Sequence, residues 1–224
     1  MESAGSFGTY PVPVRDELHR IQALAEAAPD RFLRYTYPAL LDAARAALAG
    51  LLAVPVGEVV MVQNATSGVN VVLRNLVYRP GDVIIYFDTI YGSCEKTLES
   101  IRETTPDLTL CKVDYELPCS FDVIVDGFRD VVRQVQSEGL TPKVAVFETI
   151  VAVPGVRFPF ERLTAECTSA GILSCIDGAH GVGQIPLDLG QLQPDFLVSN
   201  CHKFVPPCNR QWLPCSPPPP PPQK

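Results

Sequence analysis

The stretch Ile172–Lys203, ILSCIDGAHGVGQIPLDLGQLQPDFLVSNCHK, contains two short apolar runs that are each followed by polar residues. The runs Ile172–Ile176 and Phe196–Val198 are predicted strands, because short continuous apolar runs are typical of strands buried on both faces. Asp177 directly follows the first run, and Lys203 lies a few residues after the second. Open α/β sheets bind ligands at the carboxyl ends of their parallel strands. This stretch therefore predicts a parallel sheet with ligand-facing residues at the strand ends.

The same alternation of strands and helices extends upstream. Further strands are predicted at Val59–Val62, Val83–Phe87, Leu108–Val113 and Lys143–Phe147. Helical periodicity predicts helices at Arg15–Ala28, Ala39–Leu52, Ser67–Val77, Glu95–Thr104, Phe121–Glu138 and Pro159–Ala170. Thr66 is the predicted N-cap of the third helix, since threonine is a favoured N-cap residue. Together these elements predict an α/β fold with three layers and a mostly parallel sheet.

Composition narrows the class of protein. The 224 residues are 46% apolar and 19% charged, which is enough for a substantial core, and the net charge of −7 argues against a nucleic-acid or anionic-membrane surface. The start of the sequence does not resemble a signal peptide, and no apolar run is long enough to span a bilayer, so a cytoplasmic location is expected. The eight cysteines form no CxxC pairs. We expect free thiols and no metal site.

Four features stand at predicted strand ends. Asn64–Gly68 opens a helix, and the backbone N–H groups of a helix start bind anions such as phosphate. Tyr91 follows the strand that ends at Phe87, and its ring could stack on a planar ligand. Asp177 and Lys203 are the third and fourth features. Singly, each has a more ordinary interpretation: a helix cap, a core aromatic ring, a loop acid and a solvated lysine.

In combination the four features are much more specific. An anion-binding helix start, an aromatic ring, an acid and a lysine follow one another in that order, which is the set that pyridoxal phosphate requires. The acid keeps the pyridine nitrogen protonated, the lysine holds the aldehyde as an imine, and the helix start holds the phosphate. We therefore expect pyridoxal phosphate as the cofactor.

The segments GSFGTYP, NATSGVNVVLRNL, PGDVIIYFDTIYGSCEKTLESIRETTP, IDGAHGVGQIPLDL and SNCHKF resemble class V aminotransferase-fold enzymes. Within that class they are similar to the isopenicillin N epimerase-like and hercynylcysteine sulfoxide lyase-like group. The resemblance covers about Ser6 to Phe204. It implies the large domain of the fold type I pyridoxal-phosphate transferases, a small C-terminal domain after it, a small-molecule amino-acid substrate and a homodimer.

The resemblance also implies a role for individual residues. Lys203 is expected to form the internal aldimine and to transfer the Cα proton, which makes it the catalytic residue. Asp177 is expected to pair with the pyridine nitrogen and His180 with the phenolic oxygen. The remaining expected cofactor contacts are Ala65 and Thr66 at the phosphate, assisted by Asn200 and His202, and Tyr91 stacked on the ring.

The sequence departs from this pattern after the lysine. Residues 205–224 contain nine prolines, whereas the family continues with a strand and a small domain. We interpret residues 1–35 as an N-terminal segment, 36–204 as an incomplete cofactor-binding domain and 205–224 as a proline-rich tail that is disordered. The tail is interpreted as a product of a shifted reading frame, splicing or gene modelling; a docking peptide for a proline-recognising domain is the alternative.

Two hypotheses about function remain open at this point. In the first, the chain is an enzyme that acts on an amino acid by carbon–sulfur lysis, epimerisation or transamination, which share a Cα carbanion. In the second, it is a truncated and inactive fragment that at most binds the cofactor or a partner subunit.

Overall fold

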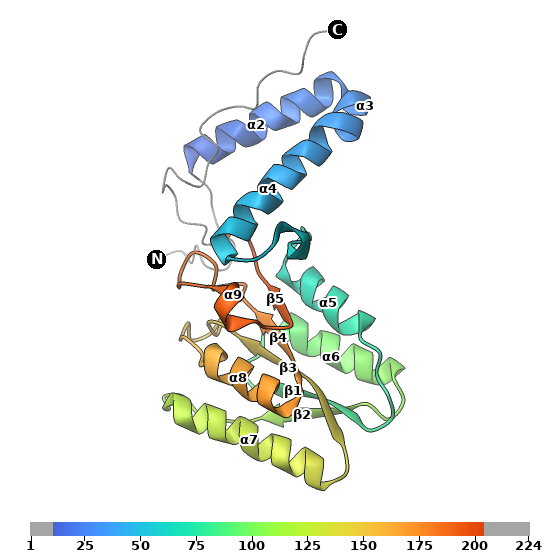
Figure 1. Cartoon of the computed structure of the whole chain (residues 1–224), viewed down its shortest axis with the longest axis vertical. Coiled ribbons are helices and arrows are strands. Elements are labelled where there is room, and N and C mark those ends of the chain that lie inside the picture. The colour runs from blue at the N-terminus through green and yellow to red at the C-terminus, as the bar shows by residue number, and fades with distance from the viewer. Residues whose placement is uncertain (1–10, 204–224) are drawn as a thin grey trace.

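The computed structural model describes residues 11–203, and these contain a five-stranded sheet in the order β2-β1-β3-β4-β5. The strands are β1 (Asp82–Phe87), β2 (Thr109–Val113), β3 (Thr141–Glu148), β4 (Leu173–Asp177) and β5 (Phe196–Val198). Every neighbouring pair is parallel. The α/β architecture and the parallel sheet predicted from the sequence are therefore confirmed (Figure 1).

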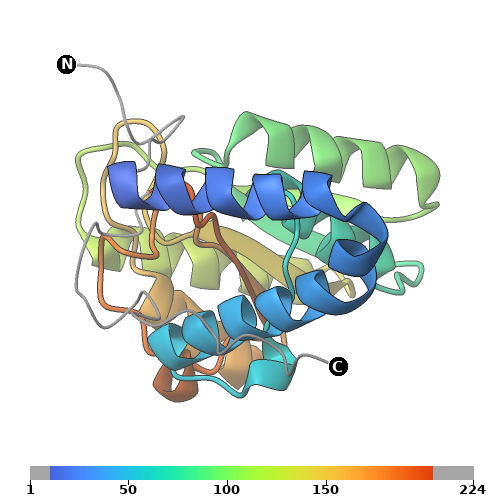
Figure 2. The same ribbon diagram turned by 90° about the horizontal axis from the view of Figure 1, so that it is seen from above.

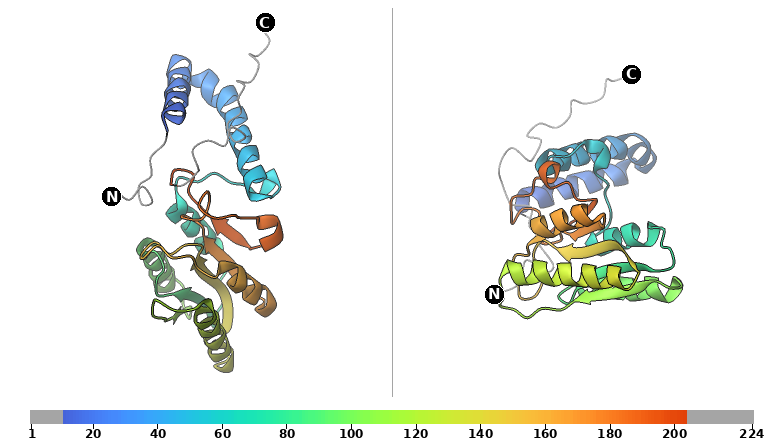
Figure 3. Two further views of the ribbon diagram at one scale, coloured as in Figure 1. Left: turned by 90° about the vertical axis from the view of Figure 1, so that its left-hand side faces the viewer. Right: turned by 60° about the horizontal axis from the view of Figure 1, so that its bottom comes forward.

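Helices cover both faces of this sheet and give it three layers (Figures 1 and 3). Helices α5 (Ala65–Asn75) and α6 (Gly92–Thr104) pack on one face, and α7 (Phe121–Ser137) and α8 (Phe160–Ala170) on the other. Alternate side chains of a strand point to opposite faces. Thus Ile84 of β1 joins the core under α5 and α6, whereas Val83 and Ile85 join the core under α7 and α8.

The strand predicted at Val59–Val62 is wrong. The backbone at Val59 is extended, but the segment pairs with no strand in the described chain, and the side chain of Val60 is 75% exposed. A cleft of about 780 Å³ is lined by this segment on one side and by β5 on the other. An apolar run forms a strand only where a partner supplies the hydrogen bonds, and the cleft lies where that partner would be.

The predicted cap of α5 is corrected by two residues. Asn64, not Thr66, is the N-cap: its backbone is extended and its side chain accepts a hydrogen bond from the N–H of Ser67 at 2.8 Å. Both residue types favour this position, so spacing alone does not separate them. Thr66 instead lies within the first helical turn.

The first described helices form an arm that projects from the sheet (Figure 1), and Figure 2 shows the same arm from above. The arm consists of α2 (Val12–Ala27), α3 (Pro29–Arg31), the π-helical turn η1 (Phe32–Thr36) and α4 (Tyr37–Leu52). The sequence predicts α2 and α4, but it places a break at Pro29–Asp30 where the chain continues as helix after Ala28. Figure 3 shows that α2 and α4 diverge from their junction. The one other unpredicted helix in the described range is the short α9 (Leu189–Leu192).

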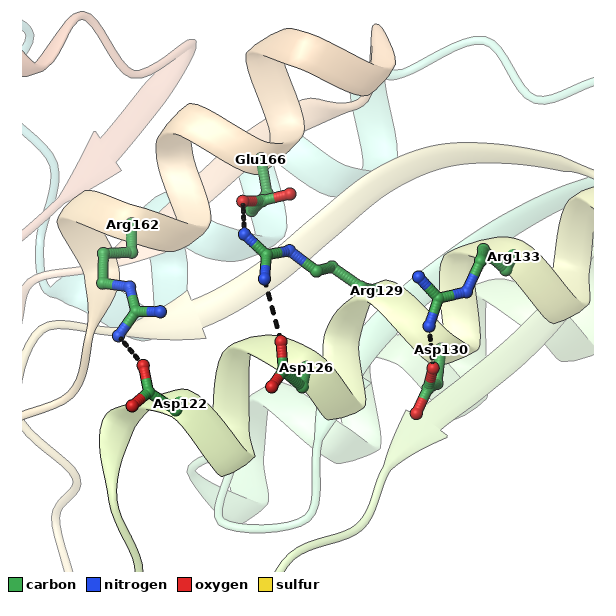
Figure 4. Close-up of polar contacts among 7 residues, drawn as sticks. All are labelled: Asp122, Asp126, Arg129, Asp130, Arg133, Arg162 and Glu166. Carbon is green, nitrogen blue, oxygen red and sulfur yellow. Dashed lines mark hydrogen bonds and ion pairs between the residues drawn. The ribbon is translucent and has the colours of Figure 1, made fainter.

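Ion pairs join α7 and α8 on the outer face of the body (Figure 4). Arg129 of α7 binds Glu166 of α8 at 2.5 Å, and Arg162 of α8 binds Asp122 of α7 at 2.8 Å. These pairs join the two helices. Because they are solvent-exposed for the most part, they add little to the stability of the fold.

Several sequence-based expectations lie outside the described residues. The start of the resemblance at about Ser6 and the proline-rich segment 205–224 belong to these, and the division of the chain after residues 35 and 204 stays a prediction. Within residues 11–203, the six cysteines are free thiols, as expected. No helix in the same range combines the length and the apolar character that crossing a membrane requires.

Candidate functional site

A pocket of about 150 Å³ lies at the carboxyl ends of β3, β4 and β5. All eight residues that the sequence singles out line it together: Ala65, Thr66, Tyr91, Asp177, His180, Asn200, His202 and Lys203. Four further residues complete the lining: Asn64, Glu148, Ala152 and Ala179. The fold thus brings the residues singled out in the sequence into one pocket, while the chemical role of each residue stays a proposal.

The start of α5 forms the first wall of the pocket. The buried side chain of Asn200 accepts a hydrogen bond from the N–H of Ala65 at 2.9 Å, and Asn64 accepts one from Ser67. Two of the donors of the first turn are therefore engaged within the protein. The N–H of Thr66 has no backbone hydrogen-bond partner in the described chain, and Thr66 lines the pocket. An anion at this helix start would bind Thr66.

Asp177 ends β4 and is 6% exposed. Its Oδ1 accepts a hydrogen bond from the N–H of Ala179 at 2.9 Å, and the thiol of Cys94 lies 3.7 Å from Oδ2. Burial raises the pKa of Asp177, whereas the Ala179 N–H and the charge of Lys203 act in the opposite direction. Two donors hold the carboxylate, so it keeps a fixed orientation at the pocket floor.

Lys203 and His180 lie next to each other in the pocket lining. Nζ of Lys203 lies 3.3 Å from Nε2 of His180. Burial and the charge of Lys203 lower the pKa of His180. The ring is therefore neutral at physiological pH, and its Nε2 can accept a hydrogen bond from the lysine ammonium.

Tyr91 and His202 lie at the rim. The tyrosine side chain is 48% exposed, and its carbonyl oxygen accepts hydrogen bonds from the first turn of α6. His202 is exposed and lines both the pocket and the neighbouring cleft. Both side chains are free to approach a ligand from the solvent side.

Two polar residues of the site are missed by the sequence reasoning. Glu148 ends β3 as Asp177 ends β4, and the two residues are direct neighbours in the sheet register. Cys94 is buried in α6 and contacts Asp177. The signal that singles out Asp177, an acid at the end of a buried strand, is also present at Glu148. No signal in the sequence distinguishes Cys94 from an ordinary core cysteine.

The pocket fits the expected cofactor in its chemistry. It offers a helix start to an anion, a buried carboxylate to a cationic ring nitrogen and a primary amine to an aldehyde. Oε2 of Glu148, which lines the pocket, is a buried polar atom without a hydrogen-bond partner. Such atoms are rare in proteins and call for an explanation, which a bound ligand would supply here.

A parallel three-layer α/β body with a lysine, an acid and an anion-binding helix start at its strand ends defines a pyridoxal-phosphate-dependent enzyme fold. The chain belongs to the aminotransferase class V family, whose family model matches residues 33–208. The class and the family expected from the sequence are thus confirmed.

Known proteins agree with this assignment. An L-cysteine desulfhydrase-like protein of Epichloe uncinata is 41% identical over 209 residues, which cover 92% of this chain and 46% of that protein. Hercynylcysteine sulfoxide lyase of Schizosaccharomyces pombe is 27% identical over 201 residues, which cover 90% and 50% of the two chains. This chain therefore spans about half the length of the curated relatives it matches.

Solved structures support the fold. The complex of the cystine C–S lyase C-DES with its product cysteine persulfide matches with a TM-score of 0.77 at 18% identity, covering 90% of this chain and 53% of that one. The same lyase has been solved with glycine covalently linked to its pyridoxal-phosphate cofactor. The cofactor expected from the sequence is confirmed at the level of family and fold.

Proposed function

We propose that this chain is the cofactor-binding part of a pyridoxal-phosphate-dependent lyase that cleaves the carbon–sulfur bond of a cysteine-like amino acid. The observation that supports this proposal best is the convergence of Lys203, Asp177 and Thr66 on one pocket. Three separate strand ends or helix starts contribute these groups, and each matches a different part of the cofactor.

In this proposal each of several lining residues contacts a different part of the cofactor. Thr66 binds the phosphate through its N–H and hydroxyl groups, and Asn200 fixes the helix start by its bond to Ala65. Asp177 holds a negative charge beside the ring nitrogen, and Tyr91 covers one ring face. When bound, pyridoxal phosphate supplies an electron sink for negative charge at the substrate Cα.

Lys203 is the residue that transfers a proton to and from the substrate in this proposal. Its Nζ is the primary amine of the pocket, and it alternates between a neutral form that accepts a proton and an ammonium form that donates one. His180 lies 3.3 Å away and accepts a hydrogen bond from the ammonium form, which orients Nζ towards the pocket. Lys203 is therefore the proposed catalytic residue.

The substrate class is suggested by the relatives. Names that refer to cysteine desulfhydrase and hercynylcysteine sulfoxide lyase share cleavage of a carbon–sulfur bond. Another relative, the isopenicillin N epimerase of Amycolatopsis lactamdurans, keeps epimerisation as an alternative outcome, and transamination is a third. A chain that binds the cofactor without turnover is the remaining alternative, since the match covers about half of each relative.

The test compares the purified chain with two variants, Lys203→Ala and the exposed control Lys96→Ala. With added pyridoxal phosphate, we expect the visible absorbance band of lysine-bound cofactor in the parent and in Lys96→Ala. Borohydride reduction followed by peptide mass spectrometry should place the label on Lys203. A band that survives Lys203→Ala, or a label on another lysine, would contradict the proposal.

Turnover then separates the possible reactions. With L-cysteine, carbon–sulfur lysis yields sulfide and pyruvate, which colorimetric assays detect. Loss of optical activity without sulfide would favour epimerisation, and cofactor converted to its amine form would favour transamination. Bound cofactor with none of these products from L-cysteine or from cysteine derivatives such as S-substituted cysteines would favour the inactive fragment.

Two further expectations belong to the same proposal. The first is a homodimer, which is supported by the exposed apolar side chains of the arm, among them Leu18, Leu24 and Leu33. The second is a cytoplasmic location, which stays a prediction from the sequence.

A further inference from the structure

The second acid of the pocket, Glu148, is deeply buried but incompletely paired. Its side chain is 5% exposed, and Oε2 has no hydrogen-bond partner. The backbone N–H of Tyr91 and the charge of Lys203 favour the ionised carboxylate. A buried carboxylate with so few partners is costly in free energy, so the group keeps its proton or finds a partner in a ligand.

Asp177 lies directly beside Glu148. The two residues are register partners on the parallel strands β3 and β4, so their side chains project from the same face of the sheet. Both line the pocket. Two buried carboxyl groups at this separation do not both ionise at low cost, because like charges repel strongly in a site shielded from water.

The surroundings decide which of the two acids keeps the proton. Asp177 accepts a hydrogen bond from the Ala179 N–H and contacts the Cys94 thiol, and both donors favour its ionised form. Glu148 has the Tyr91 N–H and an unpaired oxygen, and the charge of Lys203 acts on both acids alike in direction. The titratable groups around Glu148 are Asp177 of β4, Cys94 of α6, Tyr115 after β2, His180 after β4 and Lys203 after β5.

From this arrangement we propose that Glu148 is the proton-holding partner of Asp177: it stays a neutral carboxylic acid, so that Asp177 keeps its charge for the ligand. Glu148 acts through Asp177 and is a positioning residue. The inference rests on the proposed cofactor site, but its first test does not need the cofactor. Consistent with it, burial and the neighbouring Asp177 raise the pKa of Glu148 to about 8.

The first experiment measures the protonation state directly in the cofactor-free chain. Glutamate side chains labelled with carbon-13 are followed by NMR from acidic to alkaline pH. We expect one carboxyl carbon to titrate near pH 8, far above the usual range of glutamate, and to be missing from Glu148→Gln. The matched control Glu103→Gln, an exposed residue of α6, should keep that signal. A parent chain in which every glutamate titrates in the usual range overturns the inference, whatever the variants do.

Stability provides a second, cofactor-free readout. Because the pKa of Glu148 is raised in the folded state, the unfolded chain releases this proton first as the pH rises. The free energy of unfolding of the parent should therefore fall between about pH 5 and pH 8, relative to that of Glu148→Gln, whose amide does not ionise. Parallel curves for parent and variant would contradict the inference.

The third readout concerns the link between Glu148 and the ligand. Ionised Glu148 places a second negative charge next to Asp177, and this charge attracts the cationic ring nitrogen. The affinity for pyridoxal phosphate should therefore rise on the order of tenfold between about pH 7 and pH 9 in the parent relative to Glu148→Gln. Equal pH dependence in both proteins would overturn the role of Glu148 at the ligand. If neither protein binds the cofactor at any pH, the proposed function fails, and the NMR titration still decides the protonation of Glu148.

Discussion

The arm and the α/β body differ in how much of their apolar surface is covered. Helix α2 has no buried residue and α4 has one, Ala49, whereas all six residues of β1 are buried. The sequence predicts helices in both regions from the same periodicity. Periodicity thus indicates that one face of an element is apolar, but it does not indicate what packs against that face. Within the described chain, the apolar faces of the body are buried and those of the arm are largely exposed.

Core truncation should separate the two regions most strongly. Phe87 is 2% exposed, and its ring lies 5.0 Å from that of Phe158 in an edge-to-face contact. Phe87→Ala should lower the free energy of unfolding by about 3–5 kcal/mol, because it leaves a cavity in the packed core. Leu24→Ala in α2, where the side chain is 44% exposed, should change it by about 0.5 kcal/mol or less. Denaturant unfolding followed by circular dichroism measures both, and equal losses would show that the arm is as well packed as the body.

Replacing each of two helical glycines by alanine should change the free energy of unfolding in opposite directions. A Cβ at Gly68 of α5 would lie 2.4 Å from Cγ1 of Val198, whereas one at Gly50 of α4 would have no neighbour within 4 Å. Gly68→Ala should therefore destabilise the body by about 1–3 kcal/mol. Gly50→Ala should stabilise the arm by about 0.5–1 kcal/mol, since alanine favours the helix. Unfolding midpoints give both signs.

A double variant tests whether the clash at Gly68 is with the side chain of Val198. If Gly68→Ala acts through Val198, the combination with Val198→Ala should cost less than the sum of the two single changes. Additive losses would contradict the contact between α5 and β5.

Removing a surface ion pair should give the smallest difference in stability between the body and the arm. Hydrogen bonds from arginine lower the pKa of Glu166 in the body, which binds Arg129, and of Glu17 in the arm, which binds Arg20. A lowered pKa adds stability above the normal pKa of the acid, and this stability is lost as the pH falls through the lowered value. Glu166→Gln should therefore cost a little stability at neutral pH and nothing at about pH 3, whereas Glu17→Gln should leave global unfolding unchanged.

Salt provides the control for these two variants. The small loss in Glu166→Gln should shrink further in about 1 M salt, because exposed charges are screened. Urea midpoints at both salt concentrations measure it. A larger effect in the arm than in the body would contradict the view that α2 is held by local interactions alone.

Elements buried on two faces could be predicted well from the sequence. The predicted strand Val83–Phe87 lies within β1, whose six residues are all buried, because few alternatives exist for a short apolar run between turn residues. Val59–Val62 has the same apolar character and forms no strand in the described chain. Strand formation depends on a hydrogen-bonding partner, and this information is not contained in the run itself.

The same distinction applies to the site. Asp177 and Lys203 were predicted because their order along the chain matches a known chemical pattern. Glu148 was missed because its significance comes from its register with Asp177, which is a property of the sheet. The choice of Asn64 over Thr66 as cap likewise depends on backbone angles that neighbouring residues impose.

The hydrogen bond between Ala65 and Asn200 also has a consequence for the time course of biosynthesis. It joins positions 135 residues apart. At about 5–20 residues per second, a ribosome needs roughly 7 to 27 s to travel that distance. The start of α5 therefore leaves the ribosome long before the residue that fixes it, and a nascent chain passes through an interval in which the first turn of the helix is not yet anchored. The pocket is completed only after all five strands of the sheet have been synthesised, because Lys203 follows β5.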